Sequence, residues 1–159
     1  MEFQLQKGQV SFVTEPTPRW IFSSPNRIDD RDLILFKDAI SRVVKSLPGA
    51  IAYAQNLNCD GDNANQPDAN EQILSLYQGR GDEGQILRMK NCLVVNVFNG
   101  TPNLWIKRMF FSEEKQEWYT CGGGFQICLT DEVDQLILFF KSNFTVLNVA
   151  KSAKVAAQQ

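Results

Sequence analysis

The chain has 159 residues, with 43% apolar and 21% charged residues and a formal net charge of −2. These values are typical of a globular domain with a core of its own, and they exclude a strongly basic chain drawn to nucleic acid by net charge alone. We expect one α+β domain over residues 1–150, with a flexible tail at 151–159.

The N-terminal third predicts two strands followed by a helix. Residues 8–13 and 19–23 have strand composition, and two prolines between them favour a turn. A stripe of apolar residues then predicts a helix at about 30–47, which Pro48 is expected to end.

Residues 55–85 are polar and acidic, and we predict a long loop there with one short ordered element at 73–77 and with residues 58–72 mobile. Acidic residues from Asp60 to Glu71 partly match the spacing of a calcium loop, but Asn65 replaces the turn glycine and Pro67 removes an amide. We therefore predict a loop that binds no metal.

The stretch 103–143 combines a predicted hairpin with a second helix. Two segments rich in aromatic and β-branched residues flank a polar turn at 112–116, and residues 86–98 add a neighbouring strand. Apolar residues from Val133 to Phe144 then recur at helical spacing and predict a helix at 131–144, with Thr130 as its cap. The expected fold is a curved, mainly antiparallel sheet backed by two principal helices.

Histidine is absent, which excludes Ser-His and Cys-His nucleophilic mechanisms. We therefore expect that the protein is not an enzyme and that it holds no cofactor. The four cysteines lack CxxC spacing, so buried thiols in a reducing compartment are favoured over a zinc site. No apolar run approaches the ~20 residues of a membrane helix. These features predict a cytoplasmic protein.

Strand alternation predicts a binding face on the sheet. It places Trp105, Lys107 and Phe111 on one face of the sheet, and Leu104 and Ile106 on the other face. The neighbouring strand can add Arg88 and Lys90 to that face.

Aromatic rings interleaved with cations suit single-stranded DNA or RNA, because bases stack on the rings while cations follow the phosphates. The alternative is that helices bury both faces of the hairpin. A protein-interaction module, such as a chaperone, adaptor or inhibitor using the helices and the acidic segment 55–85, is the main rival function, and a small enzyme is third.

The order of the hairpin, the segment Ile127-Cys-Leu-Thr-Asp-Glu132 and the amphipathic helix resembles the C-terminal core of the positive cofactor four family. This family comprises single-stranded-DNA-binding transcription coactivators, and the Whirly proteins share its architecture. Ile106-Lys107-Arg108 lies near the family's first strand motif, and Ile127, Leu129, Thr130 and Glu132 match its second. The resemblance implies DNA binding on the sheet face, a homodimer formed through helices, and an accessory role in transcription or replication.

Overall fold

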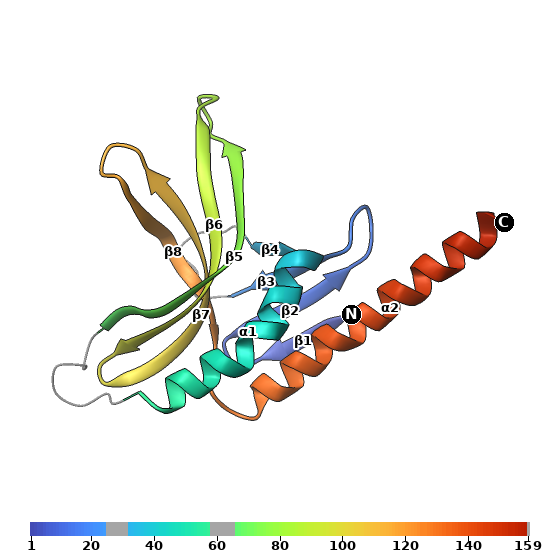
Figure 1. Cartoon of the computed structure of the whole chain (residues 1–159), viewed down its shortest axis with the longest axis horizontal. Helices are drawn as coiled ribbons and strands as arrows, with labels where there is room; N and C mark the ends of the chain where they lie inside the picture. The colour runs from blue at the N-terminus through green and yellow to red at the C-terminus, as the bar shows by residue number, and fades with distance from the viewer. Residues whose placement is uncertain (25–31, 58–65, 159) are drawn as a thin grey trace.

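The computed structural model describes residues 1–24, 32–57 and 66–158. It confirms the α+β class, with two helices and two antiparallel sheets of four strands each (Figure 1). The chain order is four strands, a helix, four strands and a second helix, so one pattern occurs twice. The strands therefore divide into two sheets, where sequence alternation suggested one.

Sheet A contains the first four strands in their chain order. They are β1 Glu2–Leu5, β2 Gly8–Val13, β3 Arg19–Ser23 and β4 Leu33–Phe36. The bounds of β2 and β3 confirm the predicted strands, but β4 occupies residues that we predicted as helix. Its alternation explains the difference, because Leu33 and Leu35 are buried while Phe36 is 53% exposed. An apolar run this short fits either a strand or a helix.

Helix α1 runs from Lys37 to Gln55 and passes through Pro48, where we predicted its end. A proline inside a helix removes one hydrogen bond and costs free energy. The buried stripe that includes Leu47 continues beyond it, because Ala50 and Ala54 also face the core. Burial of this stripe therefore offsets the local cost of Pro48.

Sheet B contains the remaining strands, again in chain order. They are β5 Gln66–Arg80, β6 Ile86–Phe98, β7 Thr101–Ser112 and β8 Glu117–Ile127. The three predicted strands of this region are confirmed. Asn99 and Gly100 join β6 to β7 with φ of 52° and 75°, the pair of positive angles that a type I′ hairpin turn requires.

Strand β5 corrects the predicted loop at 55–85. Residues 66–80 pair with β6 along almost their whole length, so the expectation that residues up to 72 are mobile is wrong there. Leu74 is 1% exposed and anchors the strand to the core. Pairing and burial override the low strand propensity of this polar segment. Residues 58–65, including the start of the calcium-like pattern, lie outside the described residues.

Helix α2 runs from Glu132 to Gln158, so it includes most of the predicted tail. Alanine, lysine and glutamine are strong helix formers and extend it beyond the predicted end at 144. At its start, the Glu132 amide donates to the Thr130 hydroxyl at 3.4 Å. In Figure 1 the C-terminal part of α2 extends away from both sheets. Neither described helix is long and apolar enough to cross a membrane.

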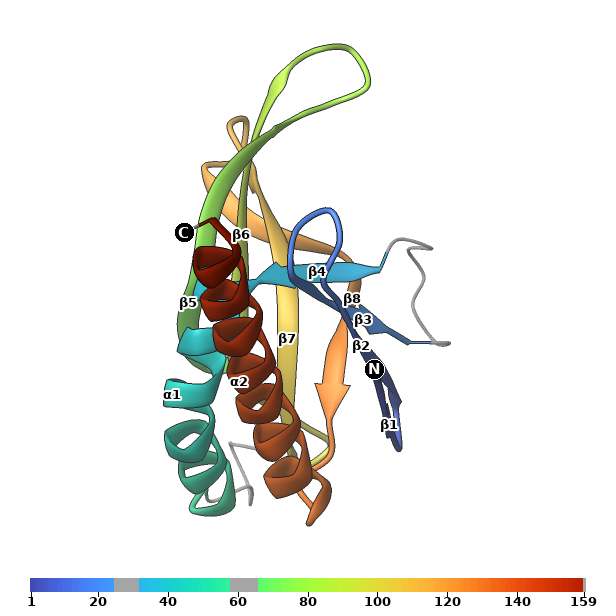
Figure 2. The ribbon, with the colours of Figure 1, turned by 90° about the vertical axis from the view of Figure 1, so that its right-hand side faces the viewer.

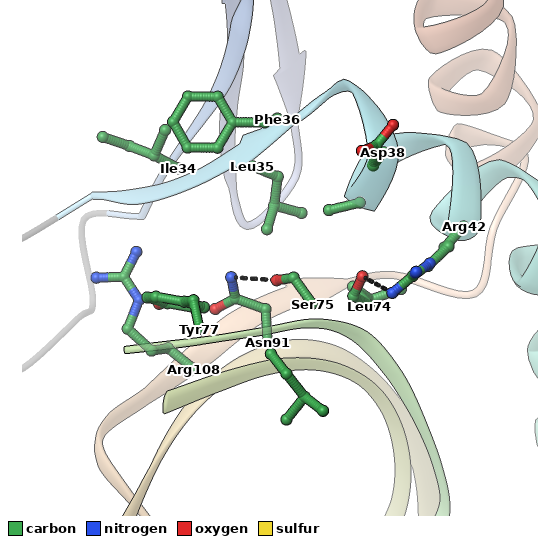
Figure 3. Close-up of a pocket in the computed structure, with 12 residues that line it drawn as sticks. Ile34, Leu35, Phe36, Asp38, Arg42, Leu74, Ser75, Tyr77, Asn91 and Arg108 are labelled. Carbon is green, nitrogen blue, oxygen red and sulfur yellow. Dashed lines mark hydrogen bonds between the residues drawn. The ribbon is translucent and has the colours of Figure 1, made fainter. Parts of the chain in front are cut away.

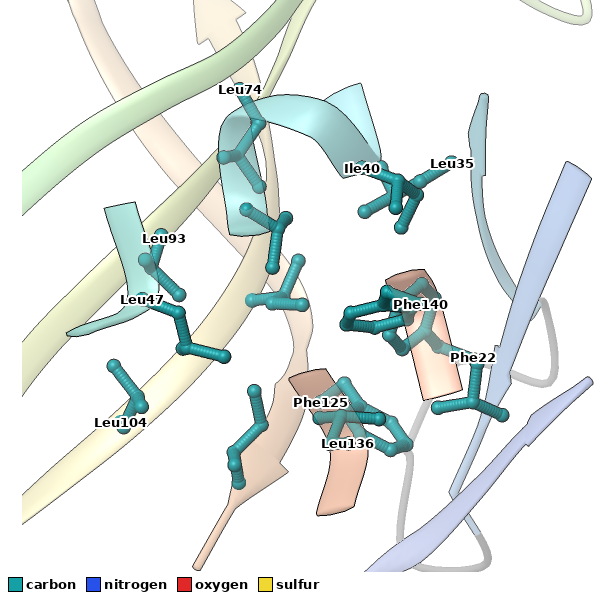
Figure 4. Close-up of a cluster of buried hydrophobic side chains, with 14 of the residues drawn as sticks. Phe22, Leu35, Ile40, Leu47, Leu74, Leu93, Leu104, Phe125, Leu136 and Phe140 are labelled. Atoms are coloured by element: carbon teal, nitrogen blue, oxygen red, sulfur yellow. The ribbon is translucent and has the colours of Figure 1, made fainter. Parts of the chain in front are cut away.

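Each helix packs on the sheet that it does not follow in sequence. Helix α1 follows sheet A but contacts β5, β6 and β7, whereas α2 follows sheet B and contacts β1 (Figures 1 and 2). Strand β7 of the predicted hairpin therefore has α1, from the first half of the chain, packed against it. One hydrophobic cluster joins both sheets and both helices, and Phe22 of β3 contacts both Phe125 of β8 and Phe140 of α2 (Figure 4).

The aromatic residues of α2 belong to this internal packing. Phe140 is fully buried, the Phe139 ring lies 5.5 Å from that of Phe3, and the Phe144 ring lies 5.6 Å from that of Trp20. These three rings therefore pack against other parts of the same chain.

We predict that Phe140→Ala lowers the free energy of unfolding by about 3–5 kcal/mol, because it removes a fully buried ring between sheet A and α2. Phe98→Ala is the matched control, since Phe98 is 64% exposed and its loss is expected to cost less than about 0.5 kcal/mol. Urea unfolding followed by circular dichroism measures both. Equal effects of the two substitutions would contradict the described core.

Candidate nucleic-acid interface

The register of sheet B brings all five predicted site residues onto one face. Cys92 and Val94 of β6 lie opposite Lys107 and Trp105 of β7, and Phe111 lies opposite Trp118 of β8. Directly opposed residues share a face, and Arg88 and Lys90 alternate with the same set. We call this surface the outer face of sheet B, because the other face carries Leu93, Leu104 and Ile106 into the core toward α1.

One end of the outer face is a cluster of rings and cations. The Arg88 guanidinium carbon lies 4.4 Å from the centre of the Phe111 ring, and the Lys90 ammonium lies 4.6 Å from the Trp118 ring. Phe111 and Trp118 meet edge to face, with ring centres 5.2 Å apart. Cations at these distances are attracted to the negative faces of the rings.

Trp118 is a central residue of this cluster that the sequence analysis did not select. It contacts Phe111 and lies near both cations, with Arg88 5.9 Å from its ring. Its position directly opposite Phe111 is a matter of register between β7 and β8. The polar turn at 112–116 was the available signal, since a hairpin closed there pairs the residues on either side of it.

Lys90 has a different environment from the one that a phosphate contact requires. It is 6% exposed, and its ammonium lies 2.6 Å from a carboxylate oxygen of Glu71 on β5. The Cys92 thiol donates to the same oxygen at 3.7 Å. A buried charge needs such a partner, so Glu71 neutralises Lys90 within the sheet. Lys90 therefore contacts the Trp118 ring while its charge is paired with Glu71.

The other end of the outer face is built around Trp105. The indole nitrogen donates to the Asn96 side-chain oxygen at 3.1 Å, and the Lys107 ammonium lies 5.9 Å from the Trp105 ring. Trp105 is half-buried, so its ring is neither a core residue nor fully displayed. The alternative that helices bury both faces does not hold for this end within the described residues.

Between the two ends, the outer face contains a buried strip. Cys92, Val94 and Met109 are buried, and Trp118 packs against them. The strip gives the flanking aromatic residues a rigid base on β-strands. Arg88, whose side chain is 51% exposed, is the most accessible cation of the cluster and lies 3.8 Å from Glu113.

The sulfur and carboxylate groups give no sign of a metal centre in the described ranges. No group of three or more potential ligands comes together there. Cys92 is a buried free thiol and Cys128 is partly buried, while Cys59 lies outside the described residues. Burial and the Glu132 carboxylate raise the pKa of the Cys128 thiol, so it stays protonated near neutral pH.

Comparison with known proteins finds no match to a family model, to a curated protein or to a solved structure.

We predict that Glu71→Ala destabilises the fold by about 2–3 kcal/mol, slightly less than the loss of one partner from a fully buried pair, because the Glu71 side chain is 28% exposed. Glu113→Ala is the control, since its partner Arg88 is exposed and the pair is expected to contribute less than about 1 kcal/mol. Urea unfolding at pH 7 compares the two. Equal, small losses would contradict a structural role for the Lys90–Glu71 pair.

Proposed function

We propose that the chain binds single-stranded DNA or RNA on the outer face of sheet B, without catalysing a reaction. The observation that carries the proposal is the cluster of Arg88, Lys90, Phe111 and Trp118, in which cations lie over aromatic rings on rigid strands. Stacking of a base on an aromatic side chain contributes about 1–3 kcal/mol, and any base can supply it.

The residues of the outer face divide into two roles under this proposal. Phe111, Trp118 and Trp105 offer ring faces to bases, while Arg88 and Lys107 neutralise phosphates. Arg88 starts the binding step stacked on Phe111, so a base that takes this place releases the guanidinium toward the backbone of the strand. Lys90 acts indirectly, since Glu71 already neutralises it.

The resemblance to the positive cofactor four family adds to the proposal, because it implies the same ligand on the same kind of surface. We assign the chain an accessory role in transcription or replication on that basis. The rival is a protein-interaction module that uses the helices and the acidic segment 55–85. It becomes the leading reading if oligonucleotides do not bind at low salt.

We predict that Trp118→Ala weakens binding to a single-stranded oligonucleotide by about 1–3 kcal/mol, because it removes the central ring of the cluster. Trp118→Phe keeps a stacking surface and should recover most of the affinity. Tyr53→Ala removes an exposed aromatic residue on α1 and should leave affinity unchanged. Fluorescence anisotropy measures affinity, and thermal melts verify that each variant is folded.

Charge is separated from stacking by salt dependence. Lys107→Gln should reduce the slope of log affinity against log salt by about one phosphate contact, whereas Trp118→Ala should leave the slope unchanged. A wild-type protein that binds no oligonucleotide at low salt, or a Trp118→Ala variant that binds as tightly as wild type, would refute the proposal.

We also propose a homodimer, formed through α2. Leu138 is 63% exposed and Val146 is 41% exposed, and their spacing places them on one side of the helix. Leu138→Glu combined with Val146→Glu should convert a dimer of twice 18.0 kDa into a monomer in analytical ultracentrifugation. Tyr53→Glu on α1 is the control. A wild-type mass of one chain at all concentrations would exclude the dimer.

A further inference from the structure

A second candidate site lies on the opposite face of sheet B, at the edge of the core. A cavity of about 480 Å³ opens between β4, the start of α1 and strands β5 to β7 (Figure 3). This volume lies within the roughly 300–1,000 Å³ of small-molecule sites. Asn91 and Arg108 line it from β6 and β7, and they alternate with the outer-face residues Lys90 and Lys107. The cavity is therefore distinct from the outer face.

Two aromatic side chains come from opposite walls of this cavity. Phe36 lies on the β4 side and Tyr77 on the sheet B side (Figure 3). Phe36 is 53% exposed although it lies between a buried strand residue and α1, and Tyr77 is half-buried. Two rings at the walls of one cavity suit a flat ligand, because each ring can cover part of its surface.

Two residues that line the cavity each contain a buried polar atom without a partner, one an acceptor and the other a donor. The Asn91 amide nitrogen donates to the Ser75 hydroxyl at 3.0 Å, but the Asn91 oxygen is buried without a partner. The Nε–H of Arg108 is also buried without a partner. Asn91 and Arg108 are directly opposed in the register of β6 and β7. A buried acceptor and a buried donor that both lack partners destabilise the unliganded state.

We propose that this cavity binds a nucleobase, as part of a nucleotide. Every base presents a donor beside an acceptor along its Watson–Crick edge, so it can donate to the Asn91 oxygen and accept from the Nε–H of Arg108. The flat faces of the base then contact Phe36 and Tyr77. Both polar atoms are buried in the unliganded state, so binding requires a shift of the partly exposed Arg108 side chain that exposes its Nε–H and the Asn91 oxygen to the base.

The charges around the cavity favour recognition of the base over recognition of the phosphate. Arg42 and Arg108 line it together with Asp38, and the Arg42 guanidinium donates to the Leu74 carbonyl oxygen at 2.8 Å. The Asp38 carboxylate offsets part of the positive charge of the two guanidinium groups, which reduces the attraction of the cavity for a simple anion. A phosphate therefore adds affinity without being sufficient for it.

The test uses the full chain and uridine 5′-monophosphate in isothermal titration calorimetry, with uridine and ribose 5-phosphate as comparisons. We expect uridine 5′-monophosphate and uridine to bind, and ribose 5-phosphate, which lacks a base, to bind at least about tenfold more weakly. Phe36→Ala should weaken nucleotide binding about tenfold, and its exposed position leaves the fold intact. Asn91→Leu removes the acceptor for the base edge and should therefore also weaken nucleotide binding.

Tyr53→Ala is the matched control, because it removes an exposed ring elsewhere on α1, and it should leave nucleotide binding unchanged. Equal affinity for ribose 5-phosphate, unchanged affinity in Phe36→Ala, or no binding of either nucleotide or nucleoside at millimolar concentration would overturn the inference.

Competition identifies the source of the nucleotide. Displacement of uridine 5′-monophosphate by a short single-stranded oligonucleotide assigns the cavity to a nucleotide of a bound strand, and its persistence assigns the cavity to a free mononucleotide. The inference does not rest on the outer face. If Trp118→Ala loses oligonucleotide binding but retains mononucleotide binding, both proposals are supported. If Phe36→Ala leaves mononucleotide binding intact, only the nucleobase proposal for the cavity is refuted.

Discussion

The exchange of helices between the two sheets is the constraint on which the rest of the structure depends. Sheet B has an apolar face containing Leu93, Leu104 and Ile106, and α1 from the first half of the chain covers it. Sheet A has a corresponding face that meets Phe140 of α2. Neither half can remove its apolar strand residues from water with its own helix alone. Burial of that surface therefore couples the halves, because each supplies the other's cover.

This exchange also places the two candidate sites. Because α1 takes one face of sheet B, the outer face is left to the aromatic and cationic residues of β6, β7 and β8. Because α1 begins directly after β4, its first turn lines the cavity together with Asn91 and Arg108 of sheet B. A binding surface on rigid strands and a cavity at a strand-to-helix junction thus follow from one packing arrangement.

Sequence patterns predicted the fold where local chemistry was unambiguous. The strand composition of residues 86–98 and of the segment before the turn at 112–116 predicted β6 and β7, and the positive φ angles of Asn99 and Gly100 close the hairpin between them. The same patterns failed for β4, whose four residues fit two periods, and for α1 beyond Pro48, where tertiary burial outweighs a local penalty. The partner of each helix was beyond prediction, because amphipathicity indicates that a face is buried but not against what.

The residues of the candidate site also divide into those that the sequence predicted and those that it did not. Alternation on β7 placed Trp105, Lys107 and Phe111 on one face, as the register shows. Trp118 and Glu71 depend on pairings with β8 and β5, and Glu71 lies in a segment that composition alone assigns to a loop. The burial of Lys90 could not be predicted without that acid. Lys90 was therefore expected to meet phosphate, and its contact is a carboxylate.

The polar composition of β5 has a consequence for how the molecule behaves in a crowded solution. β5 is an end strand of sheet B, and end strands offer backbone groups that can pair with strands of other chains. Its charged residues Asp68, Glu71 and Arg80, together with Pro67, oppose such pairing. Some of the residues that led to the prediction of a loop here thus also protect a long sheet edge from aggregation.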